Sequence, residues 1–164
     1  MSRSEMVRSL SRRQFVITVV AGSAAAAALS AAPARLAMAA EEPQNVEEAI
    51  KLLVGDKELA DGADLISLDL PQIAENGNTV PLGISVESPM TEEDHVTAVH
   101  IFAEGNPRPG VASIHFTPAN GVAQASTRMR LAKTQNVVAV AEMSDGKAYI
   151  TKAEVKVTIG GCGG

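Results

Sequence analysis

"EVKVTI" (residues 154–159) decides the fold class, because apolar and polar residues alternate along it without interruption. Successive side chains of a β-strand point to opposite sides, so this segment would turn one face to a core and the other to water. The expected core face carries Val155, Val157 and Ile159. A glycine pair follows at once. We therefore predict a strand that ends at Ile159.

Short segments rich in β-branched residues recur along the rest of the chain, separated by turn signals such as "AENGN", "EGNPRPG" and "SDGK". Many short strands at this spacing, without helices between them, are typical of antiparallel sandwiches. We therefore predict an all-β, immunoglobulin-like antiparallel β-sandwich of about seven strands. The predicted strands span residues 65–70, 79–87, 96–103, 111–116, 124–132, 136–143 and 147–159.

One short N-terminal helix is predicted ahead of the strands, in "NVEEAIKLLVGD" (residues 45–56). Asn45 can cap its first turn, with Glu48 at the reciprocal capping position. Gly55 can end the helix. Helical spacing predicts an apolar face formed by Val46, Ile50 and Leu53.

The composition favours one domain with an aliphatic core. The chain has 164 residues, of which 46% are hydrophobic but only 2% are aromatic, and it contains no Trp. A chain of this length can bury one sizeable core. Surfaces that bind single-stranded nucleic acid by stacking need aromatic platforms. Such a function is therefore not expected.

The first 39 residues differ from the rest: an arginine-rich start, an apolar stretch and a small-residue segment ending in Ala37-Met38-Ala39. This order predicts a signal peptide that is removed. A membrane anchor is the alternative, but small and hydroxyl residues dilute the apolar stretch. "SRRQFVI", in which Arg12 and Arg13 are adjacent, is typical of the twin-arginine export route. We therefore expect a periplasmic protein in three parts: signal peptide 1–39, sandwich domain 40–159 and glycine arm 160–164.

Removal of the predicted signal leaves 9 basic and 18 acidic residues, a net charge of −9. Nucleic acid and anionic membranes repel such a surface. We therefore expect no nucleic-acid partner and, after signal removal, no membrane contact. The twin-arginine route carries folded proteins, which favours a partner chain bound before export.

The only cysteine, Cys162, lies in "GGCGG". One cysteine cannot form a disulfide within the chain, so it is free, intermolecular or chemically used. A glycine segment brings no apolar neighbours with it, which argues against a cysteine kept for packing. Glycine is also conformationally free, so we expect a mobile arm that presents the thiol to other proteins. The glycines of this arm are Gly160, Gly161, Gly163 and Gly164.

The sequence around the cysteine offers no group that would activate its thiol. Activation usually needs a nearby cation or a helix N-terminus, and the closest basic residue along the chain is Lys156. We therefore expect the pKa of the Cys162 thiol to lie at or above its ordinary value. No catalytic residues are predicted in the chain itself.

Other candidate sites are weaker. His95, His100 and His115 lack the clustered ligands of a zinc site, so neither a metal nor another cofactor is expected. Asn76 and Gly77 form a turn signal that sets strand geometry. A contact between this turn and a partner stays open as a second possibility.

Several stretches together resemble the SoxY family, the sulfur carriers of bacterial thiosulfate oxidation. They are the twin-arginine leader, "PQIAENGNTVPLGISVESPM", "RMRLAKTQNVVAVAEMSDG" and, most specifically, "VKVTIGGCGG". The resemblance implies a carrier that holds sulfur intermediates covalently on Cys162 and pairs with a SoxZ-type subunit. It also implies transient contacts with the SoxAX cytochrome, with the hydrolase SoxB and, where present, with the sulfur dehydrogenase SoxCD.

Two rival functions stay open at this point. A structural interaction module would use Cys162 only for a disulfide between chains. An enzyme would use Cys162 as its own nucleophile and would need a local base. The first rival predicts an obligatory disulfide-linked dimer, and the second predicts activity of the purified chain alone.

Overall fold

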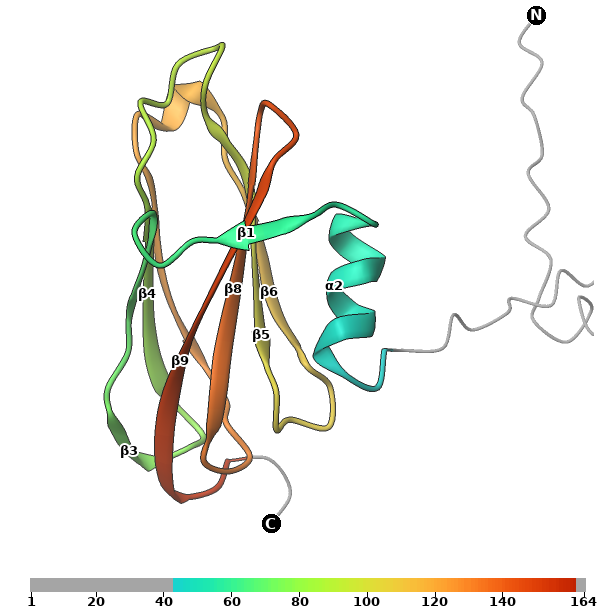
Figure 1. Ribbon diagram of the computed structural model, residues 1–164. Helices are drawn as coiled ribbons and strands as arrows, with labels where there is room; N and C mark the ends of the chain where they lie inside the picture. Colours follow the sequence, from blue (N-terminus) through green and yellow to red (C-terminus); the bar gives the residue numbers. More distant parts are fainter. Residues whose placement is uncertain (1–42, 162–164) are drawn as a thin grey trace, which may run out of the picture. The chain divides into compact units, whose positions relative to one another are not determined.

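The computed structural model describes residues 43–161, which form a β-sandwich with one helix on its outside (Figure 1). The predicted signal peptide with Arg12 and Arg13 lies outside the described residues, as do Cys162, Gly163 and Gly164. Within the described part, no helix is long and apolar enough to cross a membrane. The elements are α2 (Val46–Val54), β1 (Leu59–Asp61), β2 (Ile66–Asp69), β3 (Ile73–Asn76), β4 (Val80–Val86), β5 (Val96–Ala103), β6 (Gly110–His115), η1 (Pro118–Asn120), β7 (Ala123–Met129), β8 (Gln135–Met143) and β9 (Ala148–Ile159).

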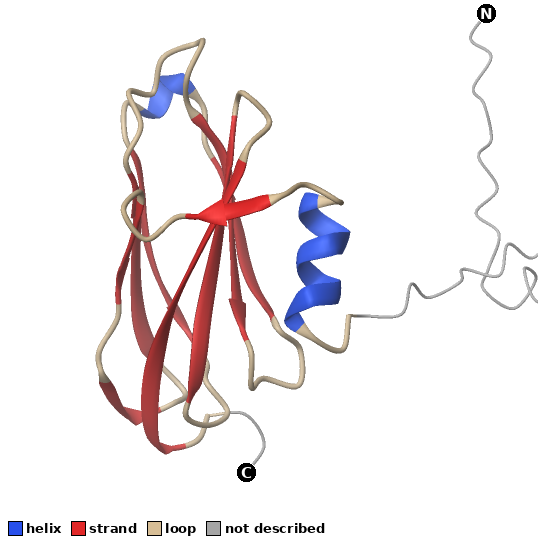
Figure 2. Cartoon of the chain, in the orientation of Figure 1, coloured by secondary structure: helices blue, strands red, loops and turns tan. Residues whose placement is uncertain are grey.

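Two sheets form the layers of the sandwich (Figure 2). The larger sheet has the order β1-β9-β8-β5-β6, and β3 also pairs with β9. The smaller sheet has the order β2-β4-β7. This arrangement confirms the prediction of an all-β sandwich with a short N-terminal helix.

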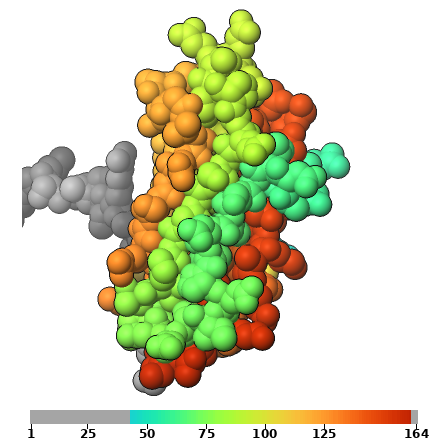
Figure 3. All heavy atoms as spheres, turned by 90° about the vertical axis from the view of Figure 1, so that its left-hand side faces the viewer, coloured from blue at the N-terminus to red at the C-terminus, as the bar shows by residue number. Residues whose placement is uncertain are grey.

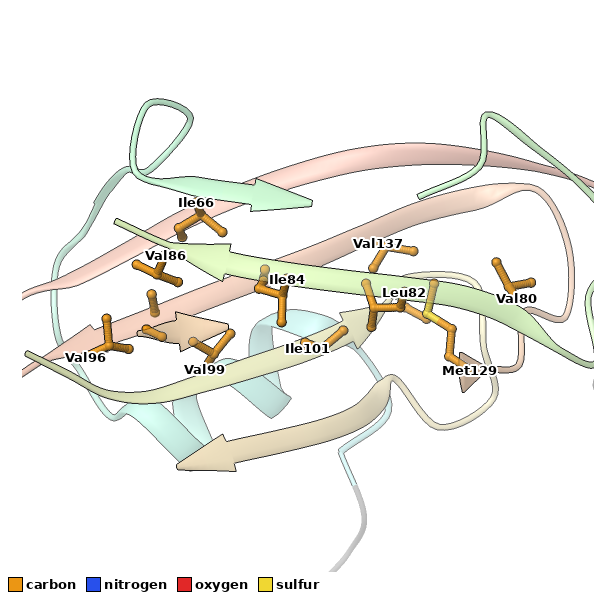
Figure 4. Packing of buried hydrophobic residues seen from close by; sticks show 14 of the residues in the cluster. Ile66, Val80, Leu82, Ile84, Val86, Val96, Val99, Ile101, Met129 and Val137 are labelled. Carbon is orange, nitrogen blue, oxygen red and sulfur yellow. The ribbon is translucent and has the colours of Figure 1, made fainter. Parts of the chain in front are cut away.

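The core between the sheets is aliphatic, as the composition predicted (Figure 4). Strand β4 contributes every second residue to it, because its side chains alternate between the core and the outside. The buried residues of β4 are Val80, Leu82, Ile84 and Val86. They pack with residues of the larger sheet that include Val99, Ile101 and Val137.

A second, smaller core lies between α2 and the outer face of the larger sheet. Phe102, Val138 and Val140 project from the sheet into this core. Asn45 caps the helix, since its side chain accepts a hydrogen bond from the Glu48 amide at 2.8 Å. The predicted apolar face is wrong at Leu53, which is 47% exposed. The residues of α2 that are buried are Ala49, Ile50 and Val54.

The strand pairing departs from the prediction in one respect. All seven predicted strands are present, but β1 and β3 were not expected, and both run parallel to β9. They are short and bury few residues, so alternation gave little signal for them. Strand β9 has 12 residues, and β8 pairs antiparallel along one of its edges. The other edge is long enough to pair with β1 near its start and with β3 near its end. The sandwich is therefore mixed rather than purely antiparallel.

Candidate functional site

The end of β9, from which the glycine segment continues, meets two other parts of the backbone. The Gly77 amide donates to the Ile159 carbonyl at 2.7 Å, and the Leu131 amide donates to the Gly77 carbonyl at 2.8 Å. The Gly161 amide then donates to the Leu131 carbonyl at 2.9 Å. We call these three hydrogen bonds the tail clamp. It joins the turn after β3, the loop between β7 and β8, and the C-terminal segment, which meet at one end of the sandwich (Figure 1).

The backbones in the tail clamp approach so closely that only glycine fits at three positions. A Cβ atom on Gly77 would collide with the Leu131 carbonyl oxygen, and one on Gly161 would collide with the Gly77 carbonyl. A Cβ atom on Gly160 would collide with the carbonyl of Ala132. None of these glycines has a positive φ, so the reason is close approach and not backbone conformation.

Side chains beneath the loop between β7 and β8 hold its backbone in place. The Asn106 side chain accepts from the Ala132 amide at 2.9 Å and donates to the Arg130 carbonyl at 2.9 Å. Gln135, which is only 7% exposed, donates to the same Asn106 side chain at 3.0 Å. The Leu131 side chain is fully buried. The Leu131 carbonyl accepts from Gly161, and the residues directly before and after Leu131 are both hydrogen-bonded to Asn106.

The turn on the other side of the tail clamp is closed by its own side chains. Asn76 accepts from the amide of Asn78 at 2.9 Å, an arrangement that stabilises tight turns. Asn76 also pairs with Ile159 in the register of β3 and β9, so the turn is tied to the end of the last strand. In Figure 3 this end of β9, in red, lies beside the green β3 and β4 segments.

The first two residues of the predicted arm have contacts that the sequence did not suggest. Gly161 is hydrogen-bonded, and Gly160 lies against the Ala132 carbonyl. These contacts come from the turn after β3 and the loop between β7 and β8. The sequence does not reveal that both lie beside the tail. The mobility of residues 160–164 stays a prediction. Ile159 is 65% exposed although it continues the core face of β9, so the strand extends beyond the core.

The fold also brings basic residues near the tail that are remote in sequence. Arg130 and Lys133 are exposed in the loop whose Leu131 carbonyl accepts from Gly161. The expectation of an unactivated thiol rested only on Lys156 and other neighbours along the chain. Cys162 itself lies outside the described residues, so the pKa of its thiol stays a prediction.

The histidines are not brought together into a ligand cluster. Among residues 43–161, no group of three or more His, Cys, Asp or Glu side chains is arranged to hold a metal ion. His100 is buried on the outer face of the larger sheet, where Nδ1 lies 2.8 Å from the Ser113 hydroxyl and Nε2 lies 2.9 Å from Glu142. His115 packs edge-on against the His100 ring. The second carboxylate oxygen of Glu142 bonds Lys57.

These contacts predict an acid-sensitive contribution to stability. Burial tends to raise the pKa of Glu142, but hydrogen bonds and charge from Lys57 and His100 outweigh it and lower the pKa. A carboxyl with a lowered folded pKa stabilises the protein above its unfolded pKa, and this contribution disappears as pH falls through the folded pKa. We expect Glu142→Gln to reduce the unfolding free energy at neutral pH by about 1–3 kcal/mol.

The measurement is urea unfolding at a series of pH values. The difference between wild type and Glu142→Gln should shrink as the pH falls through the acid range in which carboxyls titrate. Glu154→Gln, at an exposed position of β9, is the matched control and should change the unfolding free energy little. An unchanged gap between wild type and Glu142→Gln across this range would contradict the assignment.

Comparison with known proteins identifies the family. The family model described as "Sulfur oxidation protein SoxY" matches residues 50–162. The solved structure of the sulfur carrier protein SoxY from Chlorobium limicola f thiosulfatophilum is 36% identical, covering 70% of this chain and 97% of that one, with a TM-score of 0.60. The chain belongs to the SoxY family. A comparison with curated protein sequences found no match.

The SoxY fold is shared with proteins of other function. A superoxide reductase (neelaredoxin) from Ignicoccus hospitalis is 14% identical, with a TM-score of 0.52, covering 57% of this chain and 80% of its own. The superoxide reductase from Nanoarchaeum equitans is 13% identical, with a TM-score of 0.51, covering 60% of this chain and 100% of its own. At these identities the similarity concerns the fold alone.

The SoxY family match gives the tail clamp its context, because the matched residues run through the clamp to Cys162. Sequence reasoning singled out Cys162 and the glycines around it but missed Leu131, Ala132 and Asn106. Backbone carbonyls leave no trace in residue type, so nothing marked Leu131. The only signal for Gly77 was its turn pattern, which does not reveal that the tail passes beside it.

Proposed function

We propose that the protein carries sulfur intermediates of thiosulfate oxidation covalently on Cys162. The observation that supports this most strongly is the SoxY family match, which covers residues 50–162 and so includes the cysteine to which we assign the sulfur. The related Chlorobium protein, which is 36% identical, is described as a sulfur carrier. Cys162 is also the chain's only thiol, so any covalent sulfur chemistry on a cysteine falls to this residue.

The proposed loading step joins the Cys162 sulfur to the outer sulfur of thiosulfate. A sulfur–sulfur bond forms, the thiol loses its proton, and an electron pair passes to a cytochrome of the SoxAX type. In the next step water attacks the terminal sulfonate, so sulfate leaves and a persulfide stays on Cys162. A hydrolase of the SoxB type would catalyse this cleavage, and a SoxCD-type dehydrogenase, where present, would oxidise the remaining sulfur.

The chain itself would act as a carrier and not as a catalyst. Among the described residues next to the tail, the side chains that bond the backbone of the loop between β7 and β8 are the amides of Asn106 and Gln135, which are poor acids and bases. The proposal places the protein in the periplasm, exported by the twin-arginine signal around Arg12 and Arg13. It also includes a stable complex with a SoxZ-type subunit, formed before export because that route carries folded proteins.

A reconstituted pathway tests this proposal against its rivals. A carrier mixed with thiosulfate and its partner enzymes should alternate between a free thiol and sulfur-loaded forms, which non-reducing gels and thiol alkylation can follow. The purified chain alone should leave thiosulfate unchanged. An obligatory disulfide-linked dimer with no alkylatable thiol would support the interaction module instead. Thiosulfate consumption by the chain alone would support an enzyme.

A further inference from the structure

The tail clamp carries an inference that rests on the proposed carrier function and goes beyond it. We propose that Gly77 is a positioning residue for the carrier cysteine. Its amide donates to Ile159 at the end of β9, and its carbonyl accepts from Leu131, whose own carbonyl accepts from Gly161 in the tail. Cys162 then directly follows Gly161, which the tail clamp connects to the sandwich.

The hydrogen bonds of the tail clamp are continuous through Gly77. This residue donates to Ile159 and accepts from Leu131, so it connects the last strand with the loop after β7. Leu131 in turn accepts from Gly161, which lies two residues beyond Ile159. The chain is therefore hydrogen-bonded both at Ile159, the last residue of β9, and at Gly161 in the tail. A tail that only continued the strand outward would need none of these partners.

The shape of the contact also requires glycine on both sides. A Cβ atom on Gly161 would collide with the Gly77 carbonyl, and a Cβ atom on Gly77 would lie 2.8 Å from the Gly161 nitrogen. Two glycines thus face each other with their backbones in direct contact. Flexibility alone would explain the glycines of the tail, but it would not explain a glycine at position 77. Mutual close approach explains both.

Side chains and hydrogen bonds connect the rest of the tail clamp to the sandwich. The Leu131 side chain is fully buried, and Asn106 bonds the backbone of residues on both sides of it. Thr134 adds a bond from the same loop to β9, because its hydroxyl accepts from the Val157 amide at 2.9 Å. The carbonyl that accepts from Gly161 is therefore tied both to the core and to β9.

A held tail restricts where partner enzymes can dock. Consecutive Cα atoms are about 3.8 Å apart, so a held Gly161 places the Cα of Cys162 within that distance of the clamp. A tail free from Ile159 onward would allow that atom to lie up to about 10 Å from the strand end. An enzyme that acts on the thiol must then contact the end of the sandwich formed by residues 76–79 and 130–134.

Amide hydrogen exchange of the full chain, measured by NMR, tests the clamp without using activity. The Gly161 amide should exchange about tenfold more slowly than an unbonded amide, the effect of one hydrogen bond. In Gly77→Ala the new methyl group displaces the tail, and this protection should be lost while the other strand amides keep theirs. Gly110→Ala is the matched control, because nothing lies within 4 Å of a Cβ at Gly110.

Two outcomes would overturn the clamp: an unprotected Gly161 amide in the wild type, or full protection in folded Gly77→Ala. If Gly77→Ala does not fold, Gly160→Ala replaces it, because its methyl group would meet the Ala132 carbonyl from the tail side. Retained protection of Gly161 in that variant would equally overturn the clamp.

Kinetics of thiosulfate loading add a readout that stability alone would not move. Release of the tail should lower kcat for loading of Gly77→Ala by roughly tenfold, since misplacing a reacting atom is costly, and should leave KM for the carrier unchanged. A kcat equal to or above that of the Gly110→Ala control would contradict the positioning role. If the wild type accepts no sulfur at all, the carrier proposal fails, and the exchange experiment still decides the clamp.

Discussion

Replacing Cys162 by serine is expected to abolish thiosulfate oxidation in a reconstituted Sox system. A serine hydroxyl is similar in size but cannot form the sulfur–sulfur bond that holds the intermediate, and the chain has no second thiol to replace it. The loss should be complete, because the substitution removes the attachment atom itself. Thiosulfate consumption and sulfate release measure the effect.

The same substitution should leave the sandwich unchanged. Residue 162 lies beyond β9, so Cys162→Ser should change the unfolding free energy by less than about 0.5 kcal/mol. Thr158→Ser, at an exposed position of β9, is the matched control that alters a side chain near the tail and keeps the thiol. It should retain turnover. Sustained turnover by Cys162→Ser would rule out the carrier function.

Phe102→Ala is expected to destabilise the protein more than Glu142→Gln does. Phe102 is 1% exposed and fills the core between α2 and the larger sheet, together with Val138 and Val140. Truncation to alanine would leave a cavity that the rigid sheet cannot close, at a cost of about 3–5 kcal/mol. Urea unfolding followed by circular dichroism measures the difference.

An exposed residue provides the comparison for this prediction. Val122 is 62% exposed, so Val122→Ala should cost less than about 0.5 kcal/mol. A loss below about 1 kcal/mol for Phe102→Ala would contradict the packing of α2 against the sheet. The protein would then rely on the core between the two sheets alone.

The sequence predicted the long strands well because each has enough residues for a clear pattern. Strand β9 shows alternation over most of its length, and β5 is bounded by turn residues on both sides. Strands β1 and β3 are too short to show a period, and they exist because β9 offers them an edge. Leu53 was placed on the wrong side of its helix because Ala49 and Val54 provide an equally apolar stripe.

The candidate site was predicted only in its chemistry. Cysteine is recognisable by type, and its glycine neighbours exclude a packing role, so Cys162 could be found from the sequence. The tail clamp consists of backbone groups contributed by Gly77, Leu131 and Gly161, which are far apart along the chain. Contacts between carbonyls and amides of remote loops depend on the three-dimensional arrangement of the sheets, and residue types alone do not specify them.

The intact mass of the protein purified from cells growing on thiosulfate tests the carrier function most directly. We expect a mixture of the unmodified chain and sulfur adducts, with every adduct confined to the C-terminal peptide that contains Cys162 and removed by reducing agents. The mass should also show that residues 1–39 have been removed. A homogeneous unmodified chain under these conditions, or an adduct on any other residue, would contradict the carrier function.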